Sequence, residues 1–217
     1  MSPKDVLKSM SYCGSEEENE AQKYIRLKGF VQYQRVIEYC RIRDENPSYK
    51  VVSHLYKYDK RLRDNLYIYL ATVEEFLRAC IGNKFEDNAD ELVKTRKFEK
   101  KQSQYQSVSL TLEQLTLKEL NDMILRNKEV FSDLYDLSVL DTNLNALRVL
   151  RNKVGHHNFL LAENFQNCIV NGVENDSLKH NLLNLVYLLP AEFRKGFITA
   201  INTCAKGLDL LGREIII

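Results

Sequence analysis

Residues 151–157 combine side chains that could carry out acid–base chemistry on a phosphate ester. The segment reads Arg-Asn-Lys-Val-Gly-His-His and begins at Arg151. An arginine guanidinium stays charged and offers a planar fork of donors, and a histidine imidazole generally titrates near neutral pH. Metal-free cleavage of RNA needs a base for the 2′-hydroxyl, an acid for the 5′-oxygen and cationic donors for the phosphorane oxygens. Arg151 and His156 are therefore candidate catalytic residues, with Asn152 as a polar neighbour.

A helix predicted over about residues 138–155 would position these groups. Each residue of an ideal helix turns the side-chain direction by about 100°, which gives this helix an apolar and a polar face. The apolar face comprises Leu140, Leu144, Leu147, Leu150 and Val154, and the polar face comprises Arg148, Asn152 and His156. Arg151 falls within the angular range of the apolar face. We expect its guanidinium to reach past the apolar residues to water, to pair with a buried partner, or to face something other than the protein's own core.

Each candidate residue also has a structural explanation that requires no catalysis. Arg151 can form a salt bridge to a carboxylate on a neighbouring helix, and His156 can be an ordinary core or surface histidine. Asn152 can hydrogen-bond locally, and His157 can belong to the polar end of the helix. One histidine supplies a single acid or base at a time, so a two-fold dimer would be needed to place a second copy beside the first.

The overall charge of the chain does not favour binding to nucleic acid. Its 217 residues include 31 Lys and Arg against 30 Asp and Glu, a formal net charge of +1, so any RNA contact must come from local clustering. The strongest cluster lies between residues 94 and 101, where a solvated helix face or a mobile connector is the alternative interpretation. The weaker candidate RNA contacts are Lys94, Arg96, Lys97, Lys100 and Lys101 in that cluster, and Arg148, Lys153 and His157 near the first segment.

No pattern in the chain indicates a cofactor or a metal. The five cysteines are scattered and never spaced as Cys-x-x-Cys, which argues against a disulfide framework and a structural zinc site. His156 and His157 would point about 100° apart on a helix, so they form a poor chelating pair. Neither a signal peptide nor an apolar run of membrane-spanning length is evident. We expect a cytoplasmic protein without cofactor, metal or membrane contact.

Composition and periodicity predict an all-α fold. Glycine and proline are few, at 8 and 3 residues, which suits long helices and disfavours turn-rich β architectures. We expect a bundle of four main helices plus shorter ones, with a loose acidic leader over residues 1–20 and a single helical domain over residues 21–217. Gly82-Asn83 is expected to end a helix through a left-handed cap, and Thr116-x-x-Glu119 to open one as a capping box. The predicted helices span about 21–44 (before a break at Asn46-Pro47-Ser48), 60–81, 116 onward, 138–155, 177–189 and 192–211.

Two parts of the chain resemble known protein families. Arg151-Asn152-x-x-x-His156 resembles the Arg-polar-x-x-x-His signature of the HEPN superfamily, whose active members are mostly metal-independent ribonucleases. A second block resembles the first conserved block of the Abi-like abortive-infection proteins, which are bacterial HEPN proteins of phage defence and toxin–antitoxin systems. That block reads Leu55-Tyr56-x-Tyr58-Asp59-x-x-Leu62-Arg63 and continues through Leu66, Leu70, Glu74, Leu77 and Arg78.

The resemblance implies an HEPN-like helical bundle, a homodimer and a composite active site where the two motif helices meet. Arg151 and His156 would be catalytic and Asn152 would support them, while the small Gly155 would let the helices approach closely. The implied activity is that of an endoribonuclease that cuts RNA by 2′-hydroxyl attack and leaves a 2′,3′-cyclic phosphate. A cognate antitoxin, protein or RNA, is a further implied partner. Two other functions stay open: a catalytically silent HEPN-type module that binds RNA or protein, and a helical scaffold in which Arg151 is only an ion pair.

Overall fold

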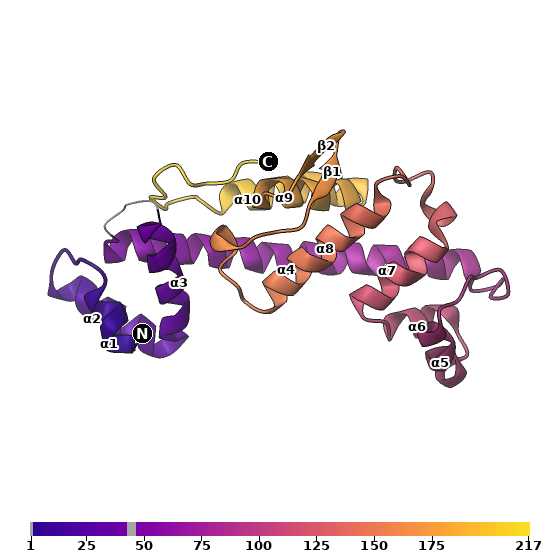
Figure 1. The fold of residues 1–217 in the computed structure, drawn as a ribbon, viewed down its shortest axis with the longest axis horizontal. Helices are drawn as coiled ribbons and strands as arrows, with labels where there is room; N and C mark the ends of the chain where they lie inside the picture. The colour runs from indigo at the N-terminus through magenta and orange to yellow at the C-terminus, as the bar shows by residue number, and fades with distance from the viewer. Residues whose placement is uncertain (1, 43–46) are drawn as a thin grey trace. The chain divides into compact units, whose positions relative to one another are not determined.

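The computed structural model describes residues 2–42 and 47–217, and most of this length is helical (Figure 1). Helices make up 67% of the structure, and the described part contains ten α-helices. The all-α fold predicted from the sequence is therefore confirmed. The helices are α1 (Pro3–Lys8), α2 (Ser15–Lys28), α3 (Phe30–Arg41), α4 (Tyr49–Phe85), α5 (Arg96–Tyr105), α6 (Val108–Glu113), α7 (Leu117–Arg126), α8 (Leu140–Gly155), α9 (Leu178–Leu188) and α10 (Ala191–Thr203), with short 3-10 helices η1 (Lys128–Phe131) and η2 (Leu160–Ala162).

The described residues also contain one two-stranded antiparallel sheet, which the sequence analysis did not predict. Strand β1 (Cys168–Val170) pairs with strand β2 (Val173–Asn175) through a tight turn. Both turn residues have a positive φ, 52° at Asn171 and 74° at Gly172. Asn-Gly is the pair that most favours such a turn, because both positions require the left-handed backbone. The hairpin therefore has a local cause in two residues of the sequence.

The chain forms two compact units, which we describe separately. The first unit comprises the described residues of Met1–Leu66, Lys153–Asn164 and Ile198–Ile217. The second unit comprises Tyr67–Asn152 and Phe165–Phe197. The prediction of a single domain over residues 21–217 stays a prediction.

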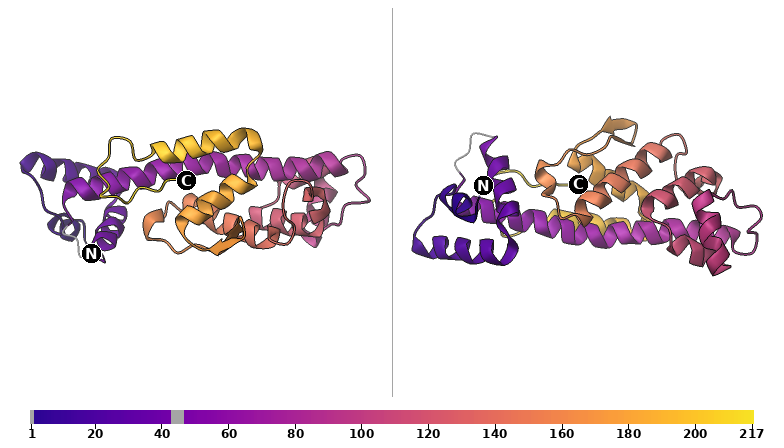
Figure 2. Two further views of the ribbon diagram at one scale, coloured as in Figure 1. Left: turned by 90° about the horizontal axis from the view of Figure 1, so that it is seen from above. Right: turned by 60° about the horizontal axis from the view of Figure 1, so that its bottom comes forward.

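In the first unit, α1, α2 and α3 pack against one another beside the start of α4 (Figure 1, Figure 2). Helix α1 lies in the segment predicted to be a loose leader, and its order has a local cause. The Ser2 hydroxyl accepts a hydrogen bond from the Asp5 amide, and the Asp5 carboxylate accepts one from the Ser2 amide. Val6 is then completely buried. Helix α2 begins at Ser15, so residues 2–20 are helical over much of their length.

The helix predicted over residues 21–44 is divided at Gly29 into α2 and α3. Gly29 has a φ of 83°, in the region that only glycine adopts without strain, and it separates the two helices. The predicted end at Asp44 and the first residue of the predicted break, Asn46, lie outside the described residues.

The last helix ends at Thr203, whereas the sequence predicted an end near residue 211. The Arg61 guanidinium donates hydrogen bonds to the carbonyls of Cys204 and Lys206, at 2.9 and 2.8 Å. Gly207 follows with a φ of 76°, which a continuing helix cannot accommodate. Arg61 and Gly207 therefore turn the chain away from the helix before the apolar residues near 211 are reached.

In the second unit, buried asparagines attach several elements to α8, the helix that carries Arg151. The fully buried Asn143 side chain accepts from the Ile169 amide at 2.8 Å and donates to the Ile169 carbonyl at 2.9 Å, which attaches β1. Asn184 of α9 donates to the Asn143 carbonyl, and Asn121 of α7 donates to the Leu144 carbonyl, both at 3.0 Å. Losing one such buried partner costs about 1–3 kcal/mol, because the other group is left unsatisfied.

Gly82 lies inside α4, and the left-handed cap predicted at Gly82-Asn83 is wrong. The helix continues to Phe85. A Cβ atom at Gly82 would lie 2.7 Å from the Ser109 Oγ, closer than real Cβ contacts allow. The Ser109 hydroxyl is fixed because it donates to Glu86 Oε2 at 2.6 Å. The absence of a side chain at Gly82 therefore allows α6 to pack closely against α4. No local pattern in the sequence predicts this packing.

We expect Gly82→Ala to destabilise the protein although alanine is the better helix former. Alanine gains about 1 kcal/mol over glycine in a helix interior, but overpacking against Ser109 costs about 1–3 kcal/mol. In a Ser109→Ala background the clash is absent, so the same substitution should raise the free energy of unfolding by up to about 1 kcal/mol. Urea denaturation of the wild type, both single variants and the double variant measures the two effects. Stabilisation of the wild-type protein by Gly82→Ala would contradict the steric role.

Candidate functional site

Arg151 lies near the end of α8, and its side chain reaches the surface of the second unit. The side chain is 49% exposed, and its Nε atom lies 3.3 Å from Oε1 of Glu74 on α4. A carboxylate partner is therefore present, as one of the expectations had it, but it does not enclose the guanidinium. No other hydrogen bond joins this guanidinium to the residues that the structure describes, so its remaining donors are available to an anion.

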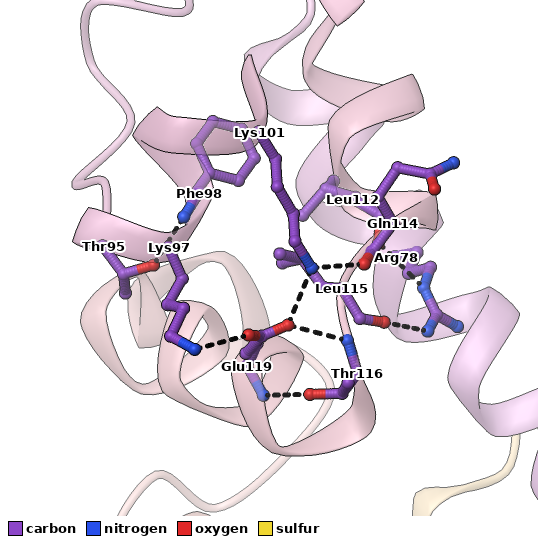
Figure 3. A network of polar contacts seen from close by, with 10 residues as sticks. All are labelled: Arg78, Thr95, Lys97, Phe98, Lys101, Leu112, Gln114, Leu115, Thr116 and Glu119. Carbon is purple, nitrogen blue, oxygen red and sulfur yellow. Dashed lines mark hydrogen bonds and ion pairs between the residues drawn. The ribbon is translucent and has the colours of Figure 1, made fainter. Parts of the chain in front are cut away.

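Glu74 is held in place by a second arginine, Arg78. The Arg78 Nη2 atom lies 3.6 Å from Glu74 Oε2, and both side chains are largely buried. Arg78 also donates to the carbonyls of Leu112 and Leu115, at 3.2 and 3.1 Å (Figure 3). Because Arg78 is anchored to backbone, Glu74 presents its other oxygen to Arg151 in a fixed position.

The neighbours of Arg151 in sequence have different environments. Asn152 is half-buried at the end of the second unit's part of α8. Arg148 donates to the Asn145 side chain on its own helix at 2.7 Å. In the first unit, Lys153 forms an ion pair with Glu163 at 2.6 Å. Arg148 and Lys153, both weaker candidates for RNA contact, are therefore engaged by groups of the chain itself.

His156 and His157 form the turn that ends α8, in the first unit. The His157 amide donates to the Val154 carbonyl at 3.1 Å, and the Asn158 amide donates to the Lys153 carbonyl at 3.0 Å. This pair of bonds is a Schellman motif, with His157 at the left-handed position that glycine usually occupies, at a φ of 54°. Both histidines are exposed. Among the residues described, none forms a hydrogen bond with the His156 imidazole.

The segment after His156 is tied to a buried ion pair on α4. Asp59 is only 1% exposed, and its Oδ2 accepts from Arg63 Nε at 2.7 Å. Its Oδ1 accepts from the Leu160 amide at 2.6 Å. The Arg63 Nη1 atom lies 3.5 Å from Nδ1 of His157; because an arginine can only donate, His157 Nδ1 is the acceptor. Burial raises the pKa of Asp59 to about 6, against the opposing effects of Arg63 and the Leu160 amide.

Four residues of α4 hold these two segments, and the sequence marked them only as parts of a family resemblance. They are Asp59, Arg63, Glu74 and Arg78. Their spacing of four residues on one helix was a signal for two acid–base pairs. The groups elsewhere in the chain that these pairs contact cannot be predicted from any local pattern in the sequence. The predicted meeting of Arg151, Asn152 and His156 from two copies in one groove stays a prediction.

Two of the five basic residues between residues 94 and 101 are paired with Glu119 in the second unit. The predicted capping box is confirmed, because Thr116 and Glu119 exchange side-chain and backbone hydrogen bonds at the start of α7. The same Glu119 carboxylate pairs with Lys97 at 3.4 Å and with Lys101 at 2.9 Å (Figure 3). These contacts, first the hydrogen bond from Lys101, lower the pKa of Glu119 to about 2. Lys94 is half-buried, whereas Arg96 and Lys100 are exposed.

Neither a metal-binding cluster nor a membrane-spanning helix is present among the described residues. Within residues 2–42 and 47–217, no group of three or more His, Cys, Asp or Glu side chains is arranged to hold a metal ion. None of the helices described is both long and apolar enough to cross a membrane. Burial raises the pKa of Cys168 to about 12 and raises that of Cys80 and Cys204, so these three thiols stay protonated at neutral pH.

Asp59 should make the stability of the protein depend on pH between about 4 and 6. The pKa of an unfolded aspartate is about 3.9, and burial raises it to about 6 in the fold, so the folded protein binds this proton more tightly. The resulting stabilisation is complete well below pH 4 and is lost as the pH rises through 6. Relative to Asp59→Asn, the wild type should lose about 2 kcal/mol of unfolding free energy from pH 4 to pH 7. Urea denaturation across this range measures the difference, and a difference that does not change with pH would contradict it.

A comparison with known protein families identifies the family to which the chain belongs. A family model described as Abi-like protein matches residues 20–136, more than half of the chain. The matched region contains the block from Leu55 to Arg78, with both acid–base pairs of α4, and ends before Arg151 and His156. No curated protein and no solved structure matches the chain. The match confirms the resemblance of the first block, and the chain belongs to the Abi-like protein family.

Proposed function

We propose that the chain is a metal-independent endoribonuclease of the HEPN superfamily, acting in phage defence or in a toxin–antitoxin system. Membership of the Abi-like family supports the abortive-infection setting. One observation carries the catalytic part of the proposal. Arg151 is half exposed beside a fixed carboxylate, and the exposed His156 imidazole is bound by none of the described residues. A cationic donor and a titratable group, both accessible, are what cleavage of a phosphodiester requires.

The proposed reaction is transfer within the RNA itself. A histidine accepts the 2′-hydroxyl proton while the 2′-oxygen bonds to phosphorus. The bond from phosphorus to the 5′-oxygen then breaks, and a second histidine donates a proton to that oxygen. The products are a 2′,3′-cyclic phosphate and a 5′-hydroxyl. Arg151 stabilises the extra charge on the phosphorane, an effect worth about 3–4 kcal/mol for a well-placed donor.

The division of acid and base between two histidines calls for a homodimer. One copy contributes a single His156, and a two-fold axis would supply the other. Asn152 would support the pair, and Gly155 would permit the close approach of two α8 ends. The proposed partners are therefore RNA, a second copy of the chain and a cognate antitoxin, whether protein or RNA.

A catalytically silent module that binds RNA or protein is the second candidate function. The ion pair between Arg151 and Glu74 favours it, because a carboxylate already balances part of the guanidinium charge. The end of the family match before residue 151 also leaves the motif outside the matched region. A helical scaffold is the limiting case, in which Arg151 serves only this ion pair.

Cleavage should require His156 and should not require a metal. We expect the wild type to cut RNA in the presence of EDTA, with His156→Ala slower by about 100-fold or more, the usual scale for a missing proton-transfer group. His157→Ala keeps the backbone contacts of that residue and loses only the ring contact with Arg63, so it should lower the rate much less than His156→Ala. Gel analysis of a labelled oligonucleotide measures the rates and identifies the cyclic phosphate. Unchanged cleavage by His156→Ala, or cleavage abolished by EDTA, would refute the mechanism.

Arg96 and Lys100 should contribute to RNA binding without contributing to the chemical step. Both are exposed and form no ion pair with Glu119, unlike Lys97 and Lys101. Reversing both charges should weaken binding to single-stranded RNA. It should also reduce the slope of the logarithm of the binding constant against the logarithm of the salt concentration. The expected reduction is about 0.7 for each phosphate that the variant no longer neutralises. Cleavage at saturating RNA should be unchanged.

Reversal of Lys8 and Lys57, two exposed lysines far from this cluster in sequence, is the control for net charge. Equal effects of the two double variants on the salt dependence would show that Arg96 and Lys100 have no special role.

A further inference from the structure

The four residues after His156 are fixed at three atoms within the first unit. The Gln32 side chain of α3 donates to the His157 carbonyl at 2.9 Å. Arg63 of α4 approaches the His157 ring, and Asp59 accepts from the Leu160 amide. Between these points Phe159 is almost completely buried and packs edge-on against Tyr39, with ring centroids 5.5 Å apart. The turn is therefore attached by polar contacts and by apolar burial together.

Asp59 takes part in both polar contacts that α4 makes with this turn, directly at the Leu160 amide and through Arg63 at the His157 ring. One of its oxygens holds the Leu160 backbone and the other orients Arg63, which is itself only 8% exposed. Burial of a charged pair costs several kcal/mol per ion and is seldom repaid in stability. A nonpolar pair of similar size would cost less, so the pair is better explained by the geometry that it imposes than by stabilisation.

The position of the exposed His156 ring depends on the turn that follows it. Because none of the described residues bonds to the ring, only the backbone on either side locates it. Helix α8 fixes the preceding side. The following residue, His157, holds a left-handed φ of 54°, which costs a residue other than glycine roughly 1–2 kcal/mol. The contacts from Gln32, Arg63 and Asp59 maintain this conformation.

We propose that Asp59 is a positioning residue for His156, acting through Arg63 and the Leu160 amide. The proposal rests on the proposed function, in which His156 transfers protons. The Asp59 charge does not touch the substrate; its two hydrogen bonds keep the turn, and so the imidazole, where the reaction needs it. A displacement of about 1 Å in such a group can cost about 100-fold in rate.

Kinetics of Asp59→Asn test the proposal against a purely structural role. We expect kcat to fall by about 10- to 100-fold while KM stays within about twofold. Asp64→Asn is the matched control, because Asp64 is an exposed aspartate of the same helix that pairs with Lys60 at the same spacing; it should leave kcat unchanged. In a His156→Ala background, Asp59→Asn should have no further effect on the residual rate, since a residue that acts through His156 has nothing left to position. An additional loss of the same size in that background would overturn the proposal.

Backbone exchange gives a readout that does not depend on catalysis. Hydrogen exchange of the amides between residues 156 and 161 should accelerate at least tenfold in Asp59→Asn and not in Asp64→Asn. If the wild type cuts no RNA, the proposed function is wrong. An unchanged exchange rate in Asp59→Asn contradicts the positioning role of Asp59 whether or not the protein cuts RNA. Should Asp59→Asn not fold, Gln32→Ala and Arg63→Lys remove other contacts of the same turn. They should lower kcat in the same direction, and wild-type kcat in both would contradict the proposal.

Discussion

The Asp59 carboxylate is almost completely removed from water, and it keeps that position only while Arg63 and the Leu160 amide both remain bonded to it. Removing either partner leaves a buried charge without compensation, which costs about 3–5 kcal/mol. The contact between α4 and the segment that follows α8 therefore contributes to the stability of the first unit. His156 belongs to the turn at the start of that segment, so its backbone is subject to the same constraint.

The same helix carries a second acid–base pair fifteen residues further along, in the second unit. Glu74 and Arg78 again lie four residues apart, and one member of the pair is again bonded to backbone outside α4: Arg78 to two carbonyls, as Asp59 is to an amide. Both pairs lie within the region that matches the Abi-like family model. Helix α4 thus supplies one such pair to each of the two units. Within each unit, this is a physical reason why the block on α4 matters to residues much later in the chain.

Local signals in the sequence were reliable where the structure depends on local bonds. The capping box at Thr116 was predicted correctly. A helix was predicted over residues 60–81, but α4 is longer and runs from Tyr49 to Phe85. The Asn171-Gly172 turn had a recognisable signature that was overlooked. Gly82 was misread because its role is to admit Ser109, a residue from another helix. Arg151 was expected to reach water, to pair with a buried partner or to face something other than the core, but its partner Glu74 could not be chosen among thirty acidic residues without the fold.

The arrangement around Glu74 bears on whether Arg151 can serve a substrate. A lone carboxylate would neutralise the Arg151 guanidinium and compete with a phosphate for its donors. Here Arg78 shares that carboxylate, so the three side chains carry one net positive charge and Glu74 is not free to follow Arg151. A phosphate that binds the exposed donors of Arg151 would bring this group to neutrality without displacing Glu74. Coulombic attraction between charges about 4 Å apart near a protein surface is worth about 4 kcal/mol, so the second arginine makes the ion pair compatible with anion binding.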